Sequence, residues 1–136
     1  MPPMQTRLTL SDAELPLEIY VPEGVAMEQG EWDTYVTEGG RFRMTVMEDH
    51  ITAEEFMNNW KANDVNKLKN VLVEDENGFV VESEVAGQSE FHFYHTVTSA
   101  DGVVYGFENA KDGSKYTEHE AMIMYTSART AGLLGE

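Results

Sequence analysis

Residues 90–109 (EFHFYHTVTSADGVVYGFEN) have the alternating pattern of two β-strands joined by a tight turn at Asp101-Gly102. Side chains in a strand point alternately to its two faces, so each face of the first strand has its own set of residues. One set is Phe91, Phe93, His95 and Val97, and the other is His92, Tyr94, Thr96 and Thr98. Bulky residues occur in both sets. The pattern therefore indicates that both faces of this hairpin are at least partly covered by other parts of the chain.

The same alternation continues toward the N-terminus in two more strands, at residues 68–74 and 79–85. Asn77-Gly78 is a strong hairpin signal, and residues 86–89 supply a slightly longer loop. Connections this short force neighbouring strands to run antiparallel. The region from 68 to 109 therefore predicts a four-stranded antiparallel meander.

The N-terminal part of the chain predicts further strands at residues 7–10, 17–21, 32–37 and 41–47. Prolines on either side of the 17–21 strand favour an edge position in a sheet, where a missing amide donor is tolerated. Arg41 and Arg43, in the last of these strands, are expected to pair with neighbouring carboxylates.

Two helices are predicted, and each begins with a T-x-x-E capping box. The first starts at Thr52 and ends at about Asn63, and the second extends from Thr117 to Thr130. The sequence thus predicts a single α+β domain over residues 1–136, with an antiparallel sheet of about six to seven strands flanked by two main helices. The termini, at about 1–6 and 132–136, are expected to be loose.

This order of elements resembles the PsbP-like superfamily over about residues 17–131. The sequences of two segments add to the resemblance, Val104-Tyr105-Gly106-Phe107 and residues 120–127 (EAMIMYTS). The superfamily has an antiparallel sheet between helices, and it includes photosystem II extrinsic subunits, a nuclear import factor that binds a small GTPase, and bacterial proteins of unknown role. No catalytic signature belongs to it, so the resemblance implies a fold and no site residues.

Charge is the strongest compositional feature of the 136 residues, because 25 acidic side chains oppose 9 basic ones and give a formal net charge of −16. Such a chain repels phosphates, so nucleic acid is excluded as a partner, whereas a basic protein surface is attracted. The alternative is that the charge only maintains solubility. The chain contains no cysteine, which excludes disulfides, thiolate metal sites and a cysteine nucleophile.

No apolar run is long enough to cross a bilayer, and residues 1–10 lack the features of a signal peptide. The sequence as it stands predicts a cytoplasmic protein, and a periplasmic or secreted one if a leader peptide has been removed. Its oligomeric state, monomer or homodimer, stays open.

Catalytic and metal-binding motifs are not found. His92 and His95 fall on opposite faces of a strand and cannot share one ion, and residues 75–78 lack the spacing of a calcium loop. We therefore predict no catalytic residue, no metal and no cofactor.

Two groups of residues are candidates for binding. Polar-tipped rings on a sheet face that the helices leave uncovered are candidates for ligand or partner contact, with core packing as the alternative: Trp32, Tyr35, His92 and Tyr94. Carboxylates on and near the 79–85 strand form a predicted acidic patch for a basic partner or weak calcium binding, with a solvated edge as the alternative: Asp75, Glu76, Glu82, Glu84 and Glu90.

These features favour a non-enzymatic acidic interaction module. One version is an immunity or inhibitor protein that blocks a basic toxin, and another is a secretion chaperone, although such chaperones normally begin with a helix. A different class is a small-molecule or lipid carrier, in which the sheet face around Tyr94 opens into an apolar groove. An enzyme of unrecognised type is the third hypothesis.

Overall fold

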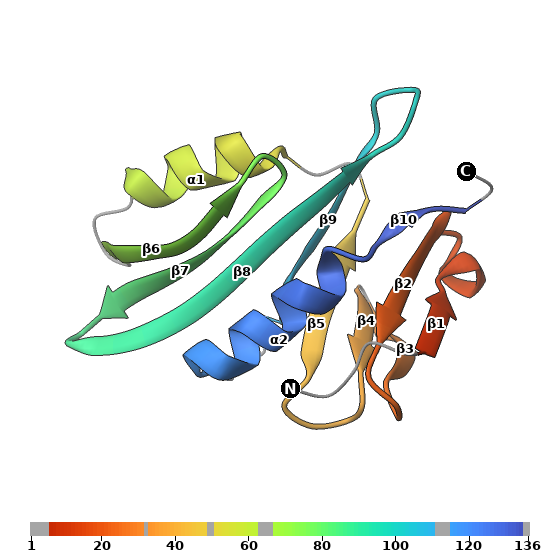
Figure 1. Ribbon diagram of the computed structural model, residues 1–136, viewed down its shortest axis with the longest axis horizontal. Coiled ribbons are helices and arrows are strands. Elements are labelled where there is room, and N and C mark those ends of the chain that lie inside the picture. Colours follow the sequence, from red (N-terminus) through yellow and green to blue (C-terminus); the bar gives the residue numbers. More distant parts are fainter. Residues whose placement is uncertain (1–5, 32, 49–50, 63–66, 111–114, 135–136) are drawn as a thin grey trace.

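The computed structural model describes residues 6–31, 33–48, 51–62, 67–110 and 115–134. Its main element is a seven-stranded antiparallel sheet with the strand order β3-β4-β5-β9-β8-β7-β6 (Figure 1). The strands are β3 (Ala26–Gln29), β4 (Thr34–Thr37), β5 (Arg43–Met47), β6 (Lys67–Asp75), β7 (Gly78–Val85), β8 (Gln88–Thr98) and β9 (Val104–Asn109). The predicted α+β fold, with an antiparallel sheet flanked by two helices, is confirmed.

The predicted meander is present as β6 to β9, with each strand hydrogen-bonded to the next. The turn between β7 and β8 is tighter than expected and consists of Ala86 and Gly87 alone. Both have positive φ angles, 52° and 80°, which is the backbone of the two-residue hairpin turn whose twist matches that of its strands. Gly87 adopts such an angle without steric cost, which explains the glycine at this position.

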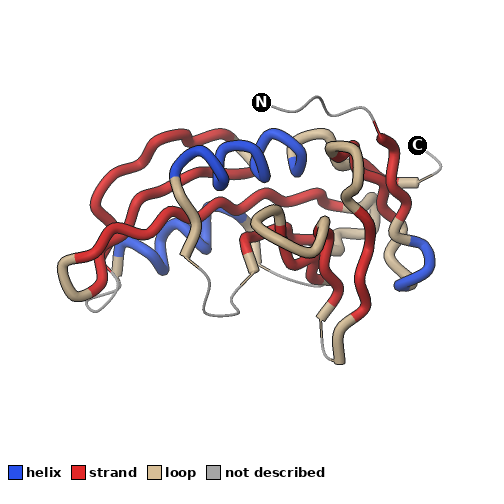
Figure 2. Tube along the Cα trace, turned by 90° about the horizontal axis from the view of Figure 1, so that it is seen from below, coloured by secondary structure: helices blue, strands red, loops and turns tan. Residues whose placement is uncertain are grey.

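Two helices, α1 (Ala53–Lys61) and α2 (Glu118–Ala128), cover opposite faces of the sheet (Figure 2). Both predicted capping boxes are confirmed. In each, the threonine side chain accepts a hydrogen bond from the backbone of the third helical residue, Glu55 or Glu120, whose carboxylate binds back to the amide of the threonine.

The alternation of β8 sorts the apolar residues into two clusters. Phe93 and the residues on its face join the larger cluster, which α2 covers, while Tyr94 belongs to the smaller one beneath α1. The larger cluster also contains the buried side chains Leu17, Ile19 and Val21 of a separate small sheet.

That small sheet has three antiparallel strands in the order β1-β2-β10, namely β1 (Thr6–Thr9), β2 (Leu17–Val21) and β10 (Gly132–Leu133). A single 3₁₀ turn (Ser11–Ala13) lies between β1 and β2. The predicted edge position of β2 is wrong, since β2 is the middle strand. Pro16 and Pro22 lie just outside β2, so they remove no amide from its hydrogen-bond ladder. The partner β10 comes from the C-terminal segment that was expected to be loose, and it is too short to give an alternating pattern.

Candidate functional site

A pocket of about 280 Å³ lies where three segments that are distant in the sequence meet. The segments are the connection between β2 and β3, the connection between β4 and β5, and the first half of α2. Its lining combines four apolar residues, Pro22, Val25, Phe42 and Ile123, with four charged ones, Glu23, Glu38, Arg41 and Glu120.

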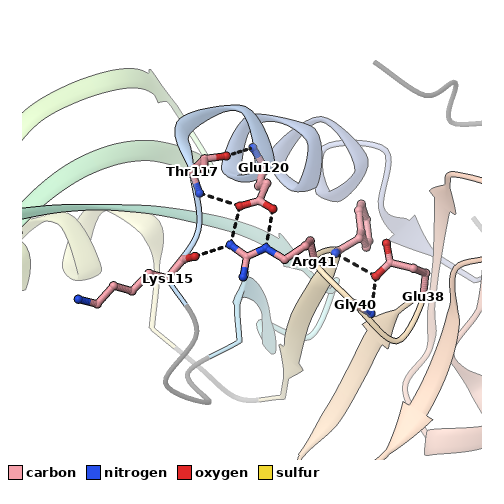
Figure 3. Close-up of polar contacts among 7 residues, drawn as sticks. Glu38, Gly40, Arg41, Lys115, Thr117 and Glu120 are labelled. Carbon is pink, nitrogen blue, oxygen red and sulfur yellow. Dashed lines mark hydrogen bonds and ion pairs between the residues drawn. The ribbon is translucent and has the colours of Figure 1, made fainter.

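The capping box of α2 positions Glu120, which lines one side of this pocket. Thr117 ends the extended segment before the helix, and its amide donates a hydrogen bond of 2.8 Å to the Glu120 carboxylate. The same carboxylate receives two hydrogen bonds from the guanidinium of Arg41, at 2.6 and 2.7 Å (Figure 3). Arg41 also donates to the backbone carbonyl of Lys115. The guanidinium thus joins the start of α2 to the β4–β5 connection with planar, two-point geometry.

The β4–β5 connection is held by Glu38. Its Oε1 atom accepts hydrogen bonds from the amides of Gly40, at 2.6 Å, and Phe42, at 3.1 Å (Figure 3). Phe42 is buried, whereas the neighbouring Arg41 side chain is 55% exposed and extends toward α2. The turn therefore directs an apolar side chain inward and a charged one across the pocket.

The rim of the pocket is negatively charged. The hydrogen bond from Arg41 lowers the pKa of Glu120 to about 2, and the hydrogen bond from the Thr117 backbone acts in the same direction. Arg41 and Glu120 offset each other's charge. Glu23 and Glu38 form no ion pair with any basic side chain in the part of the chain that the structure describes. Two carboxylates thus remain beside an apolar floor, an arrangement that suits a side chain with an apolar stem and a cationic end.

Tyr94, predicted as a contact residue, is fully buried. Its ring packs against Phe56 of α1 at 4.5 Å between centroids, and its hydroxyl donates to the carbonyl of Ile51 at 2.7 Å. The phenol also lies over Gly106, where an added Cβ would come within 2.7 Å of the hydroxyl oxygen. The core-packing alternative therefore describes Tyr94, because α1 covers the sheet face on which it lies.

His92 is 20% exposed and lies beside Trp60, with 4.9 Å between the ring centroids. Its Nδ1 is 3.3 Å from the side-chain nitrogen of Asn109, and its Nε2 is 3.2 Å from the hydroxyl of Ser83. The amide oxygen of Asn109 accepts from the Phe93 backbone, so its nitrogen faces the imidazole and can only donate. Nδ1 is therefore the acceptor, and these hydrogen bonds fix the orientation of the His92 ring.

The other two rings are not assembled with His92 and Tyr94. Tyr35 lies on β4, three strands from β8, a separation of about 14 Å at the usual spacing. The guanidinium of Arg43 covers its ring at 4.1 Å, and its hydroxyl contacts Asp33 at 3.3 Å. Trp32 lies outside the described residues. The expected pairing of both arginines with carboxylates is confirmed, through Glu120 for Arg41 and through Glu28, at 3.7 Å, for Arg43.

The predicted acidic patch is distributed over both faces of the sheet. Glu82 and Glu84 lie near Lys69 at 3.6 and 3.7 Å, and Glu90 lies near Lys115 at 3.9 Å. Pairing between β7 and β8 places Glu90 opposite Ser83, on the other face from Glu82.

The remaining two carboxylates of this set lie toward the β6–β7 turn. Asp75 accepts a hydrogen bond from Tyr125, and Glu76 is exposed. The structure therefore does not bring the five carboxylates together into one surface. No group of three or more histidine, aspartate or glutamate side chains within the described ranges is placed to hold a metal ion.

Sequence reasoning missed the pocket itself. The T-x-x-E pattern identifies Glu120 only as part of a helix capping box. Arg41 is predicted only to form an ion pair with some carboxylate. No local signal connects residues 22–25, 38–42 and 120–123, because their proximity depends on how the two sheets pack around α2.

No helix in the described part of the chain combines the length and apolar character needed to cross a membrane. Comparisons with models of protein families, with curated proteins and with solved structures give no match. The resemblance to the PsbP-like superfamily therefore stays a prediction.

Proposed function

We propose that this chain is a non-enzymatic binding module for a basic protein, and that the pocket beside α2 receives a lysine or arginine side chain of that partner. The observation on which the proposal rests is the combination of an apolar floor, formed by Val25, Phe42 and Ile123, with the carboxylates of Glu23 and Glu38 at the rim. Lysine and arginine side chains bury their methylene stems while their charged ends stay near water or a carboxylate.

The size of the pocket favours a side chain over a larger ligand. At about 280 Å³ it lies just below the range of roughly 300–1,000 Å³ that is usual for small-molecule sites. A lipid or an elongated metabolite would extend well beyond it. The carrier hypothesis required an opening around Tyr94, and the full burial of that residue beneath α1 gives it no support there.

The charge of the whole chain supports the same partner class. A formal charge of −16 accelerates the approach of a basic protein and repels an acidic one, and the effect weakens as salt screens it. A module of this kind fits either version predicted from the sequence, an inhibitor of a basic toxin or a chaperone for a basic partner.

The charges around the pocket also favour binding over catalysis. Arg41 holds the pKa of Glu120 at about 2, so this carboxylate stays ionised at neutral pH and is unsuited to exchanging protons there. The Glu38 carboxylate accepts two hydrogen bonds from backbone amides of the β4–β5 connection and so stabilises that turn.

The direct test is a backbone-amide NMR titration with N-acetyl-lysine amide and N-acetyl-arginine amide. N-acetyl-norleucine amide is the matched control, because it has a similar apolar stem and no charge. We expect the cationic amides to shift the signals of Val25, Phe42 and Ile123, and norleucine to shift them far less. Shifts that are absent, located elsewhere or equal for norleucine would refute the proposal.

A pair of variants separates the pocket from general attraction to an acidic protein. Glu23→Gln removes a carboxylate from the rim, and Asp101→Asn removes an exposed one from the β8–β9 turn. Both change the net charge by the same amount. We expect Glu23→Gln to weaken lysine-amide binding about threefold or more, a loss typical of one exposed charge contact. Equal losses in the two variants would show that binding follows net charge alone.

A further inference from the structure

Among the described strands, β6 lies at one edge of the larger sheet. It pairs with β7 along one edge, and no other described strand lies along its outer edge (Figure 1). The strand is nine residues long, and its centre exposes two adjacent apolar side chains, Val71 at 42% and Leu72 at 37%. An edge of this length is a template for pairing with another extended segment.

The charges of β6 are balanced, in contrast to the rest of the chain. Lys67 and Lys69 lie at its start, and Glu74 and Asp75 lie at its end, so two positive charges match two negative ones. The chain as a whole has a formal charge of −16. Two copies therefore repel each other over most of their surfaces, and the β6 edge is a place where they can approach without that local repulsion.

We propose that β6 pairs with β6 of a second copy of this chain in antiparallel orientation, with the twofold axis at Val71. This register places Lys67 of one copy opposite Asp75 of the other, and Leu68 opposite Glu74. The charge order of the strand, basic at the start and acidic at the end, is thus complementary to itself when reversed.

The faces of the strand agree with this register. Pairing with β7 places Leu68, Val71 and Glu74 on the α1 side, opposite Ser83, Val81 and Phe79 respectively. It places Lys67 and Asp75 on the α2 side. Residues that oppose each other across a twofold axis perpendicular to a sheet must lie on the same face, and the proposed pairs meet this condition.

The pairing of β6 with β7 has two register shifts, between Leu68 and Asn70 and between Val71 and Val73. Bulges of this kind are also found in edge strands that are protected against pairing. A protected edge commonly presents lysines to solvent. Here Lys69 is 46% exposed, but it lies near the carboxylates of Glu82 and Glu84, at 3.6 and 3.7 Å, which partly offset its charge. The exposed centre of the strand also contains the apolar pair Val71 and Leu72, which favours an interface over a protected edge.

The first test measures self-association of the full chain by sedimentation equilibrium from micromolar to millimolar concentration. We expect a reversible dimer that Val71→Lys weakens about tenfold or more, because the variant places two like charges together at the axis. Tyr20→Lys is the matched control, since Tyr20 is a similarly exposed apolar residue, at 38%, on the smaller sheet. A wild-type chain that stays monomeric throughout, or equal weakening by both variants, would overturn the proposal.

A charge reversal tests the register. Lys67→Glu places a glutamate opposite Asp75 of the second copy, twice per dimer, and should weaken the dimer about tenfold. Lys61→Glu makes the same change of net charge in the last turn of α1 and should have a smaller effect. Equal effects would contradict the register, because only Lys67 lies on the pairing strand.

Cross-linking gives a readout that is independent of affinity. The chain has no cysteine, so Val71→Cys introduces a single thiol at the twofold axis, where the two copies of residue 71 face each other. Mild oxidation should give a disulfide-linked dimer much faster for Val71→Cys than for Tyr20→Cys. Similar rates for the two variants would indicate random collision and refute the pairing.

Salt distinguishes this interface from the pocket. Added salt screens both the Lys67–Asp75 pairs and the repulsion between two chains of formal charge −16. Because the repulsion acts over most of the two surfaces, we expect it to dominate and the dimer to strengthen, whereas binding of a basic side chain should weaken. A dimer that weakens as salt rises would contradict pairing through β6. The two proposals can therefore fail independently.

Discussion

The two ends of α2 lie in different surroundings. At the N-terminal end, Glu120 and Arg41 form an ion pair beside a pocket that is open to solvent. In the C-terminal half, Tyr125 is buried against Phe93 and His95, with ring centroids 6.4 and 6.2 Å apart. One helix of eleven residues thus connects a charged surface site with an aromatic core.

The different surroundings of the two ends of α2 favour an ionised side chain at one end and neutral side chains at the other. Hydrogen bonds from Arg41 stabilise the ionised form of Glu120. Burial has the opposite effect at the other end, where it lowers the pKa of His95 to about 4 and raises that of Tyr125, so both groups are kept neutral. We infer that the C-terminal half of α2 contributes mainly to stability, whereas its N-terminal end lines the pocket that is proposed as the binding site.

Truncation of one side chain at each end should separate these contributions, and it gives the largest effect that we predict. Tyr125→Ala should reduce the free energy of unfolding by about 3–5 kcal/mol, because it leaves a cavity under the helix. Ile123→Ala, at the half-buried wall of the pocket, should cost about 1–2 kcal/mol. Urea unfolding measures both, and equal costs would remove the distinction between the two ends.

Acidification should reduce the stability contributed by the aromatic C-terminal half of α2. His95 has a pKa of about 4 in the folded chain and an ordinary value of 6.5, so between these limits the unfolded chain binds more protons. Stability is therefore lost as the pH falls from about 6.5 to 4, by up to about 3 kcal/mol. Burial is the main cause, the charge of Arg129 acts in the same direction, and Asp75 opposes it.

The variant His95→Phe tests this window. Phenylalanine cannot bind a proton, and the site already contains the rings of Phe107 and Tyr125. Urea unfolding at pH 7 and pH 5 should show a clear loss of stability on acidification for the wild-type chain and a smaller loss for the variant. The same loss in both would mean that other groups determine the acid sensitivity.

The sequence allowed the α+β class, the meander and both helix starts to be predicted, because each depends on a local pattern. Alternation identified the strands, and T-x-x-E identified the caps at Thr52 and Thr117. The alternation also separated His92 from His95, and the structure places His95 against the aromatic end of α2, on the other face from His92.

The parts that could not be predicted depend on contacts between distant segments. The position of β2 in the middle of a sheet requires β10, which is only two residues long. The burial of Tyr94 follows from the packing of α1 above it and from the space left by Gly106. The pocket likewise depends on three separate segments and has no pattern of its own.

A comparison of the two capping boxes should show a smaller effect. Glu55→Ala in α1 removes only the carboxylate that accepts from the Thr52 amide and leaves the bond to the Thr52 side chain, so it should cost about 0.5 kcal/mol. Glu120→Ala in α2 removes the corresponding carboxylate and with it the partner of Arg41, and should cost about 1–1.5 kcal/mol. Thermal or urea unfolding of the two variants measures the difference. Equal costs would mean that the ion pair with Arg41 adds nothing to stability.

The smallest effect on stability is expected from Arg41→Lys, which keeps the charge and removes the two-point hydrogen bond to Glu120. Because the guanidinium is 55% exposed, the free energy of unfolding should change by less than about 0.5 kcal/mol. The pKa of Glu120 should rise slightly above about 2, since the hydrogen bond from Arg41 is the largest cause of its shift while the charge and the Thr117 backbone remain. NMR titration of the Glu120 carboxyl measures this change. An unchanged pKa would mean that the Thr117 backbone at the start of α2, rather than the guanidinium, keeps this carboxylate ionised.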